Sequence, residues 1–291
     1  MSPAASPSTV LIAGCGYVGS ALAARLVSAG HTVHGLRRNP SGLPAGVIPL
    51  AADLLDPDLA DALPDGIDRV AYTTGASGFT EAAYEAAYVT GLRNLIAALE
   101  ARKAPIQRIV FTSSTGVYGQ SDGEWVDEDR PATATGFSGR YIREGEKLLE
   151  TMPFETVSVR LGGIYGPGRT RLIETVRDGS AVITDGPPRY LNLNHRDDCA
   201  SALEHLLFLD KPAPVYLATD GHPEDRAVIL RWIAEQLNIP EPPTVPESEA
   251  PRLRTGNKRC RNERLLATGF RFAYPDYRDG YGPLIAEMTR G

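Results

Sequence analysis

The stretch Thr9–Gly30, TVLIAGCGYVGSALAARLVSAG, constrains the fold of this chain more than any other. A run of β-branched and apolar residues ends at the first of three glycines, Gly14, Gly16 and Gly19, which have G-x-G-x-x-G spacing, and a helical pattern follows them. A strand, a glycine turn and a helix in this order bring backbone N–H groups and the positive end of a helix dipole to a dinucleotide pyrophosphate. An ordinary glycine-rich turn is the simpler alternative. The flanking patterns favour the nucleotide site.

The residues after the second predicted strand, His31–Leu36, indicate which dinucleotide would bind. A site for NAD has an Asp or Glu near this place, which accepts hydrogen bonds from the ribose hydroxyls. This chain has Arg37 and Arg38 there instead. Two guanidiniums suit the additional 2′-phosphate of NADP. A solvated charge pair in a loop is the alternative, and we favour NADP over NAD.

Further apolar runs alternate with helical patterns along the chain. Strands are predicted at 46–54, 69–75, 108–119 and 155–169, and the two long helices at 84–102 and 139–150. This alternation predicts an α/β fold with a doubly wound parallel sheet covered on both faces. From residue 170 this alternation of strands and helices ends, but a strand predicted at 215–221 belongs to the sheet again.

Composition excludes several classes of protein. The 291-residue chain has a formal net charge of −6, which argues against nucleic acid as a partner. It has no apolar run of membrane-spanning length, and its first residues lack the pattern of a secretory signal. Its three cysteines are widely spaced and are expected to be reduced thiols. We therefore expect a cytoplasmic protein with no membrane partner and no metal.

Small and hydroxyl-bearing residues follow several strands, where ligands bind in doubly wound sheets. Thr74 and Gly75 would let a cofactor pass close to the backbone, and Ser113 and Ser114 would lie near its nicotinamide. Asp53 is placed either to approach the adenine end or to cap the next turn. Any single hydroxyl can equally make a turn or cap hydrogen bond.

Several ordered motifs together resemble the extended short-chain dehydrogenase/reductase family, also called the NAD-dependent epimerase/dehydratase family. They are GCGYVG, SSTGVYG, RLGGIYGPGR, NHRDD before a helix, VYLATD, and RLLATGFRFAYPDYRDG near the end. The resemblance covers nearly the whole chain. It implies a Rossmann domain at 8–166 and 192–221 and a small C-terminal substrate-binding lobe at 167–191 and 222–291. The N-terminal residues 1–7 are expected, from their own sequence, to form a disordered tail.

The residues that do the family's chemistry are largely replaced. The family uses a Tyr as acid and base, with a Lys four residues later that lowers the Tyr pKa from its ordinary value near 10. Ser138 stands at the position of that Tyr and Ile142 at that of the Lys. Tyr88 stands where the family has an Asn, and only Ser114 matches the family pattern.

Other side chains are therefore candidates for the acid/base role. Tyr141, one turn of helix from Ser138, is the first choice, with Arg140 or Arg143 as its cation. The further candidates are Tyr118, Tyr165 and His195, for which a packing or structural role is the alternative. A small polar or anionic substrate would be contacted by residues of the C-terminal lobe: Arg169, Arg171, Tyr190, Asn192, Asn194 and Arg196.

Two functions follow from these patterns. The first is an NADP-dependent oxidoreductase or epimerase with non-standard acid/base residues; the second is a catalytically inactive NADP(H)-binding sensor. The expected catalytic residues are Ser114 and Tyr141. The expected cofactor-binding residues are Gly14, Gly16, Tyr17, Val18, Gly19, Arg37, Arg38, Asp53, Thr74, Gly75 and Ser113. The resemblance also implies a homodimer formed through the helices at 84–102 and 139–150.

Overall fold

The computed structural model describes residues 7–249 and 256–290. The predicted disordered tail, apart from residue 7, lies outside these ranges. The chain divides into two compact units. The first unit comprises 1–117, 135–160 and 199–216, and the second comprises 118–134, 161–198 and 217–291. The domain boundaries predicted above stay a prediction.

A seven-stranded parallel sheet has the strand order β12-β7-β5-β4-β1-β2-β3. Its strands alternate with helices along the chain, as the apolar runs predict. Their bounds are Thr9–Ala13 (β1), Thr32–Arg37 (β2), Ile48–Ala51 (β3), Arg69–Tyr72 (β4), Arg108–Ser114 (β5), Glu155–Leu161 (β7) and Val215–Ala218 (β12). The neighbours of β1 pair with it through Val10, opposite Val33 of β2 and Arg69 of β4. The predicted α/β fold with a doubly wound parallel sheet is confirmed.

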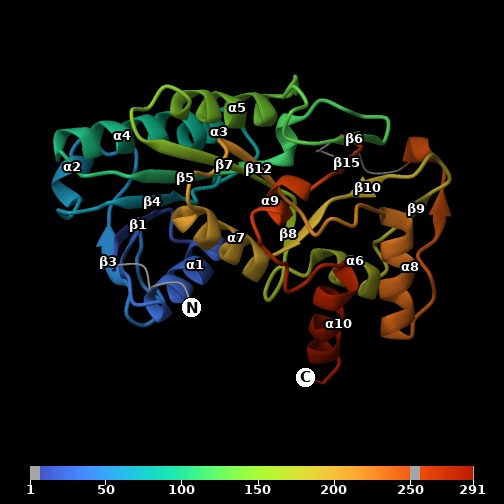
Figure 1. The fold of residues 1–291 in the computed structure, drawn as a ribbon. Coiled ribbons are helices and arrows are strands. Elements are labelled where there is room, and N and C mark those ends of the chain that lie inside the picture. Colours follow the sequence, from blue (N-terminus) through green and yellow to red (C-terminus); the bar gives the residue numbers. More distant parts are fainter. Residues whose placement is uncertain (1–6, 250–255, 291) are drawn as a thin grey trace. The chain divides into compact units, whose positions relative to one another are not determined.

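Helices cover both faces of this sheet because its strands are apolar on both sides (Figure 1). The helix α1 and the C-terminal part of α7 lie on one face, and α4 and α5 lie on the other. Helix bounds are Tyr17–Ser28 (α1), Leu59–Ala62 (α2), Glu81–Glu85 (α3), Gly91–Ala101 (α4), Phe137–Leu149 (α5) and Arg196–Phe208 (α7). The two crossover helices begin before the predicted residues 84 and 139.

The first crossover helix is interrupted by a π-helical turn, Ala86–Thr90, which the sequence pattern did not predict. The buried hydroxyl of Tyr72 donates a hydrogen bond of 2.5 Å to the Ala87 carbonyl, the partner that an α-helix would give to the Gly91 N–H. The Gly91 N–H bonds to Ala86 instead, which widens the turn. A π turn often marks a functional position, and this one contains Tyr88.

The second unit consists of short strand pairs and helices. The pairs are β6 (Glu124–Val126) with β15 (Lys258–Cys260), β8 (Gly163–Tyr165) with β11 (Leu193–His195), β9 (Ile183–Thr184) with β14 (Thr244–Val245), and β10 (Tyr190–Leu191) with β13 (Glu224–Asp225). The helices are α6 (Arg171–Arg177), α8 (Arg226–Leu237), α9 (Glu263–Ala267) and α10 (Tyr277–Met288). Short 3-10 turns occur at Thr115–Val117 in the first unit and at Glu247–Glu249 in the second.

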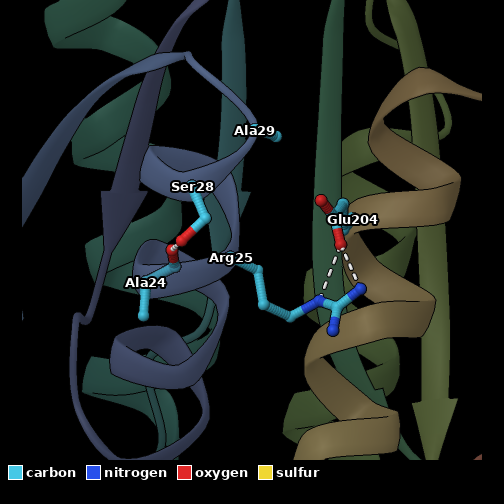
Figure 2. Close-up of a pocket in the computed structure, with 5 residues that line it drawn as sticks. All are labelled: Ala24, Arg25, Ser28, Ala29 and Glu204. Carbon is cyan, nitrogen blue, oxygen red and sulfur yellow. Dashed lines mark hydrogen bonds and ion pairs between the residues drawn. The ribbon is translucent and has the colours of Figure 1, made fainter.

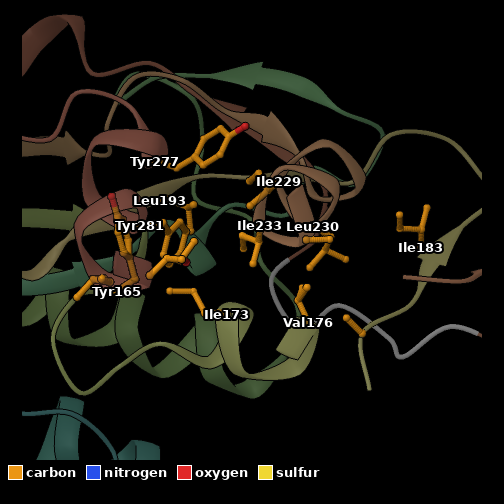
Figure 3. Close-up of a cluster of buried hydrophobic side chains, with 14 residues drawn as sticks. Tyr165, Ile173, Val176, Ile183, Leu193, Ile229, Leu230, Ile233, Tyr277 and Tyr281 are labelled. Carbon is orange, nitrogen blue, oxygen red and sulfur yellow. The ribbon is translucent and has the colours of Figure 1, made fainter. Parts of the chain in front are cut away.

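The core of the second unit is one cluster of buried apolar side chains contributed by α6, α8 and α10 and by the strands β8, β9 and β11 (Figure 3). Ile173, Ile229 and Ile233 are fully buried in it, and the rings of Tyr165 and Tyr281 pack 4.3 Å apart between their centroids. Gly280 permits this packing because a Cβ there would lie 2.1 Å from the Tyr165 hydroxyl. The predicted strand 155–169 is thus two strands, of which β8 belongs to this unit.

All three cysteines are free and buried, in agreement with the predicted reduced thiols. Across 7–249 and 256–290, no helix combines the length and apolarity that crossing a bilayer requires. In the same ranges no three His, Cys, Asp or Glu side chains are grouped so that they could coordinate a metal ion.

Candidate nucleotide-binding and catalytic site

The glycine turn closes β1 as the sequence predicts. Gly14 has a φ of +86°, a left-handed conformation that favours glycine. The N–H groups of Gly14 and Cys15 both donate to the Leu36 carbonyl at 3.0 Å, which fixes the turn against the end of β2. The Gly16 N–H donates to the Gly14 carbonyl at 2.6 Å, and α1 begins at the next residue.

Two of the glycines are required because neighbouring chain approaches them closely. A Cβ on Gly14 would lie 2.6 Å from the backbone of Thr74, and a Cβ on Gly19 would lie 2.6 Å from the Thr73 hydroxyl. The hydroxyls of Thr73 and Thr74 donate to the Gly14 and Ala13 carbonyls at 2.8 and 3.2 Å. The residues after β4 therefore bind the glycine turn directly, and a larger side chain in the turn would separate them.

The N-terminus of α1 keeps its positive end unneutralised by side chains. Gly16 is the N-cap residue and supplies no side-chain hydrogen bond, and the first turn contains no acidic residue. Tyr17 and Val18 form that first turn, and Cys15 beside it is buried, which raises the pKa of its thiol. A helix start of this kind is suited to an anion. Of the three glycines only Gly16 has open space around its Cβ position, with one atom at 3.8 Å.

The two arginines lie at the end of β2, as predicted. Arg37 is the last residue of the strand, and its Nη1 donates to the Cys15 carbonyl at 3.4 Å, so the guanidinium lies beside the glycine turn. Arg38 is exposed and, within the residues that the structure describes, forms no ion pair. Positive charge is thus available where an NAD site would have a carboxylate.

Asp53 and Gly75 follow the two strands that neighbour β2 and β1 in the sheet. One carboxylate oxygen of Asp53 accepts a hydrogen bond of 3.0 Å from the Leu55 N–H, so the capping role left open above is present. Gly75 is exposed and has nothing within 4 Å of its Cβ position. The assignment of either residue to cofactor binding stays a prediction.

Ser113 at the end of β5 belongs to a buried ionic network rather than to an open surface. Its hydroxyl donates to Oε1 of Glu146 at 2.6 Å. Arg160 of β7 donates to the same carboxylate with Nε at 2.9 Å and Nη2 at 2.8 Å, and Arg143 approaches Oε2 at 3.3 Å. Glu146 is 1% exposed. The network joins β5, α5 and β7, and it uses the hydroxyl that we expected near the nicotinamide.

Four other positions bear on catalysis: Ser114, Ile142, Ser138 and Tyr88. Ser114 is half-buried, and its oxygen accepts a hydrogen bond of 3.0 Å from the Gly116 N–H. Ile142, which the resemblance aligns with the family's Lys, is 4% exposed and belongs to the apolar core. Ser138 is half-buried on the first turn of α5. Burial raises the pKa of Tyr88 to about 12, with a further contribution from Tyr84.

Tyr141 lies on α5 and interacts with α3. Its hydroxyl donates to the Glu81 carboxylate at 3.2 Å, and Arg140 forms an ion pair with the same carboxylate. Loss of hydration raises the pKa of Tyr141, the Arg140 guanidinium lowers it, and the Glu81 charge raises it again. The other predicted cation, Arg143, pairs with Glu146 and Glu150 instead. The net shift keeps the phenol protonated.

The other acid/base candidates belong to the second unit and have structural contacts there. The Tyr118 hydroxyl donates to the Asp127 carbonyl at 2.7 Å. Tyr165 is buried in the core described above, and burial raises its pKa. His195 is 3% exposed, its ring centroid lies 3.8 Å from that of Tyr274, and burial lowers its pKa. Burial of this kind favours the packing interpretation for Tyr165 and the structural one for His195.

The residues expected to contact substrate are mostly engaged within the second unit. Asn192 donates to the Lys258 carbonyl and accepts from the Cys260 N–H, and Asn194 is fully buried. Arg196 pairs with Asp197 at 2.8 Å. Arg171 is exposed, Arg169 exchanges backbone hydrogen bonds with Gly166, and the Tyr190 ring lies under a guanidinium described below.

A surface pocket lies elsewhere in the first unit, between α1 and α7 (Figure 2). Arg25 of α1 and Glu204 of α7 close it with an ion pair of 2.6 Å, and Ala24, Ser28 and Ala29 complete its lining. These residues occupy the C-terminal half of α1, away from the glycine turn at its N-terminus. We therefore do not assign this pocket to the nucleotide.

Thr73, Glu146 and Arg160 are functional neighbours of the site that sequence reasoning did not single out. Thr73 adjoins Thr74 in the sequence, so the same strand-end argument applied to it. Glu146 and Arg160 are ordinary charged residues of a helix and a strand until the fold buries them together.

Comparison with known proteins identifies the family of this chain. The model of the NAD-dependent epimerase/dehydratase family matches residues 10–203. Protein YeeZ of Escherichia coli K12 is 31% identical over 285 residues, covering 92% of this chain and 96% of the relative. A 3-diazoavenalumate denitrifying reductase of a Streptomyces species is 27% identical, covering 94% and 99%.

A solved structure extends this agreement to the fold. The structure of a candidate NAD-dependent epimerase/dehydratase from Methylobacillus flagellatus is 38% identical, covers 98% of this chain and 100% of its own, and superimposes with a TM-score of 0.79. The glycine turn at the end of β1 and these matches over most of the chain lead to one assignment. The chain belongs to the NAD-dependent epimerase/dehydratase family of extended short-chain dehydrogenases/reductases.

Proposed function

We propose that this chain binds NADP in preference to NAD and uses it as an oxidoreductase or epimerase on a small polar substrate. The observation that carries the cofactor preference is the pair Arg37 and Arg38 at the end of β2, with the Arg37 guanidinium directed onto the glycine turn. Guanidiniums bind phosphate through charge-assisted, often bidentate hydrogen bonds. No carboxylate follows β2 to accept the ribose hydroxyls of NAD.

The acid/base chemistry must come from residues other than a Tyr–Lys pair. We assign Ser114 to orient the substrate oxygen and Tyr141 to supply a proton. Tyr141 is protonated at neutral pH, so it can donate a proton but not accept one, although its raised pKa makes it a weaker acid than free tyrosine. The proposal therefore favours reduction of a carbonyl or imine, in which a proton is donated, over oxidation of an alcohol.

A regulatory function is the alternative, in which the chain binds NADP(H) without transferring hydride. Its supporting observation is Ile142, a buried apolar residue at the position where the family's Lys would stand. Consumption of bound NADPH separates the two functions. A sensor would retain NADPH in the presence of every carbonyl and imine substrate tested.

The first experiment is a titration of the purified chain with NADPH and NADH, followed by nicotinamide fluorescence. We expect tighter binding of NADPH, and a loss of about 10- to 100-fold in its affinity in the variant Arg37→Asp, Arg38→Ala, because each charge-assisted hydrogen bond is worth about 1.5–3 kcal/mol. The control variant Lys211→Asp, Arg177→Ala changes the charge equally at exposed positions elsewhere.

Each result bears on one part of the proposal. Equal or tighter binding of NADH would refute the NADP preference and leave the family assignment in place. Failure to bind either nucleotide would refute the cofactor role and, with it, the enzyme. If NADPH binds, Tyr141→Phe is expected to slow its oxidation by substrate without weakening its binding, and unchanged turnover would remove Tyr141 from the mechanism.

We also propose a cytoplasmic homodimer, which the family resemblance implies. The helices concerned expose charged side chains, Arg93 and Glu100 on α4 and Lys147 and Glu150 on α5, so such an interface would be polar. Sedimentation at two ionic strengths tests it. A monomer at every concentration and salt would contradict the dimer.

A further inference from the structure

Two aromatic rings of the second unit hold two arginines on one surface, here called the Arg–Trp surface. It consists of Trp125 of β6, Tyr190 of β10, and Arg259 and Arg261, which lie on and directly after β15. Arg259 has its guanidinium carbon 4.8 Å from the ring centroids of both Trp125 and Tyr190. The guanidinium carbon of Arg261 lies 5.1 Å from the Trp125 centroid. Trp125 is 39% exposed, so this array is open to solvent.

Among the described residues, no carboxylate lies within ion-pair distance of the arginines of this surface. Within the described ranges neither Arg259 nor Arg261 forms an ion pair, whereas Arg264 a few residues later pairs with Asp129 at 2.6 Å. The Nε of Arg259 donates to the Gly123 carbonyl, which leaves its terminal nitrogens available. The neighbouring acid, Glu124, accepts a hydrogen bond of 2.8 Å from the Asp122 N–H.

We propose that the Arg–Trp surface binds a small ligand through its phosphate or carboxylate groups. A guanidinium matches the two oxygens of such a group, and stacking on a ring reduces the side-chain entropy lost on binding. Arg259 and Arg261 are two residues apart, which in an extended chain separates their Cα atoms by about 7 Å. This spacing suits a ligand with two anionic groups, such as a diphosphate or a dicarboxylate.

Packing alone does not explain this arrangement. One guanidinium would be enough to cover the exposed indole, and two like charges that share one ring repel each other when no anion is present. The chain as a whole is negative, with a formal charge of −6, so the surface is a local exception to the general charge.

The chain contains only two tryptophans, which makes the proposal directly measurable. Trp232 packs against the core of the second unit and edge-on to Tyr277 at 5.4 Å, so Trp232→Phe leaves Trp125 as the sole indole reporter. We would titrate this variant with pyrophosphate, inorganic phosphate and succinate at constant ionic strength, in the presence of excess NADP⁺ to occupy the proposed cofactor site. Calorimetry on the unsubstituted chain provides a second measurement that does not depend on fluorescence.

The expected result is a saturable change of Trp125 emission, with affinity weakened about tenfold or more by Arg259→Gln, Arg261→Gln. The control variant Lys211→Gln, Arg177→Gln removes the same charge from exposed sites and is expected to bind as the parent does. The relative affinities of the three anions distinguish a phosphate site from a carboxylate site. Equal weakening in both variants, a change that chloride reproduces, or no saturable binding in either measurement would overturn the proposal. The site is independent of the proposed function, because neither arginine belongs to the nucleotide site.

Discussion

Removal of the Glu146 carboxylate is expected to be one of the most destabilising single changes in the first unit. Its two oxygens accept hydrogen bonds from Ser113 and from two nitrogens of Arg160, whose side chain is only 5% exposed. Glu146→Ala leaves that guanidinium buried without its counter-ion. Breaking a buried ion pair from one side costs about 3–5 kcal/mol. Total stabilities are about 5–15 kcal/mol, so the variant would lose a large part of its free energy of unfolding.

The measurement is urea unfolding followed by circular dichroism, with linear extrapolation to water. Glu150→Ala is the matched control, because Glu150 is the C-cap residue of the same helix and pairs with Arg143 at 2.6 Å while its side chain is 53% exposed. An exposed pair of this kind is worth at most about 1 kcal/mol. Glu146→Gln, which keeps the hydrogen-bond acceptor and loses the charge, is expected to cost about 1.5–3 kcal/mol and serves if the alanine variant does not fold.

A double variant separates the pair from its surroundings. Glu146→Leu with Arg160→Met removes both charges, so it is expected to cost less than Glu146→Ala alone, since no buried ion remains unpaired. The reasoning is refuted if Glu146→Ala and Glu150→Ala destabilise the chain to within about 1 kcal/mol of each other, the size of an ordinary exposed pair.

Three further predictions use the same unfolding assay. Gly14→Ala is expected to cost about 2–4 kcal/mol, from its positive φ and the collision with Thr74, whereas a comparable cost in Gly16→Ala would contradict this origin. Arg108→Met is expected to cost about 2–4 kcal/mol of unfolding free energy, because the buried guanidinium donates to two carbonyls at the end of α7. If this substitution costs less than the same substitution at an exposed arginine, Arg108 does not have this role. Burial raises the pKa of Asp220 well above its ordinary value, so the folded chain keeps a proton that the unfolded chain releases, and stability falls as pH rises above about 4. Asp220→Asn is therefore expected to stabilise the chain more at about pH 7.5 than at about pH 4.5, and a pH-independent difference would show that the carboxyl is not protonated in the fold.

The parts of the fold that local sequence specifies could be predicted. The strand, glycine turn and α1 follow from spacing and apolar runs within one continuous segment, and the alternation of such segments indicates the parallel sheet. The replacement of the family's Tyr and Lys by Ser138 and Ile142 stays a prediction from the resemblance. The π-helical turn was not predictable, because it depends on a hydrogen bond from Tyr72, which lies on β4 and not in the helix.

The candidate site was predictable only in its backbone part. Gly14 and Gly19 are glycines because Thr73 and Thr74, about sixty residues later, lie against them. Separation along the sequence likewise hides the partners of polar side chains: the hydroxyl of Ser113, which we expected near the cofactor, donates to Glu146. Asn192, expected to contact substrate, instead joins its segment to β15.

The sequence by itself determined the class of fold, the glycine turn and the two arginines at the end of β2, because each of these is a pattern of neighbours along the chain. Only the tertiary structure decided which charged and polar groups pair with one another inside the fold and which stay exposed to solvent. Arg160 and Arg259 are, in the sequence, two residues of the same type. The fold buries the first against Glu146 and places the second on an exposed indole, because burial and pairing are set by contacts between distant segments.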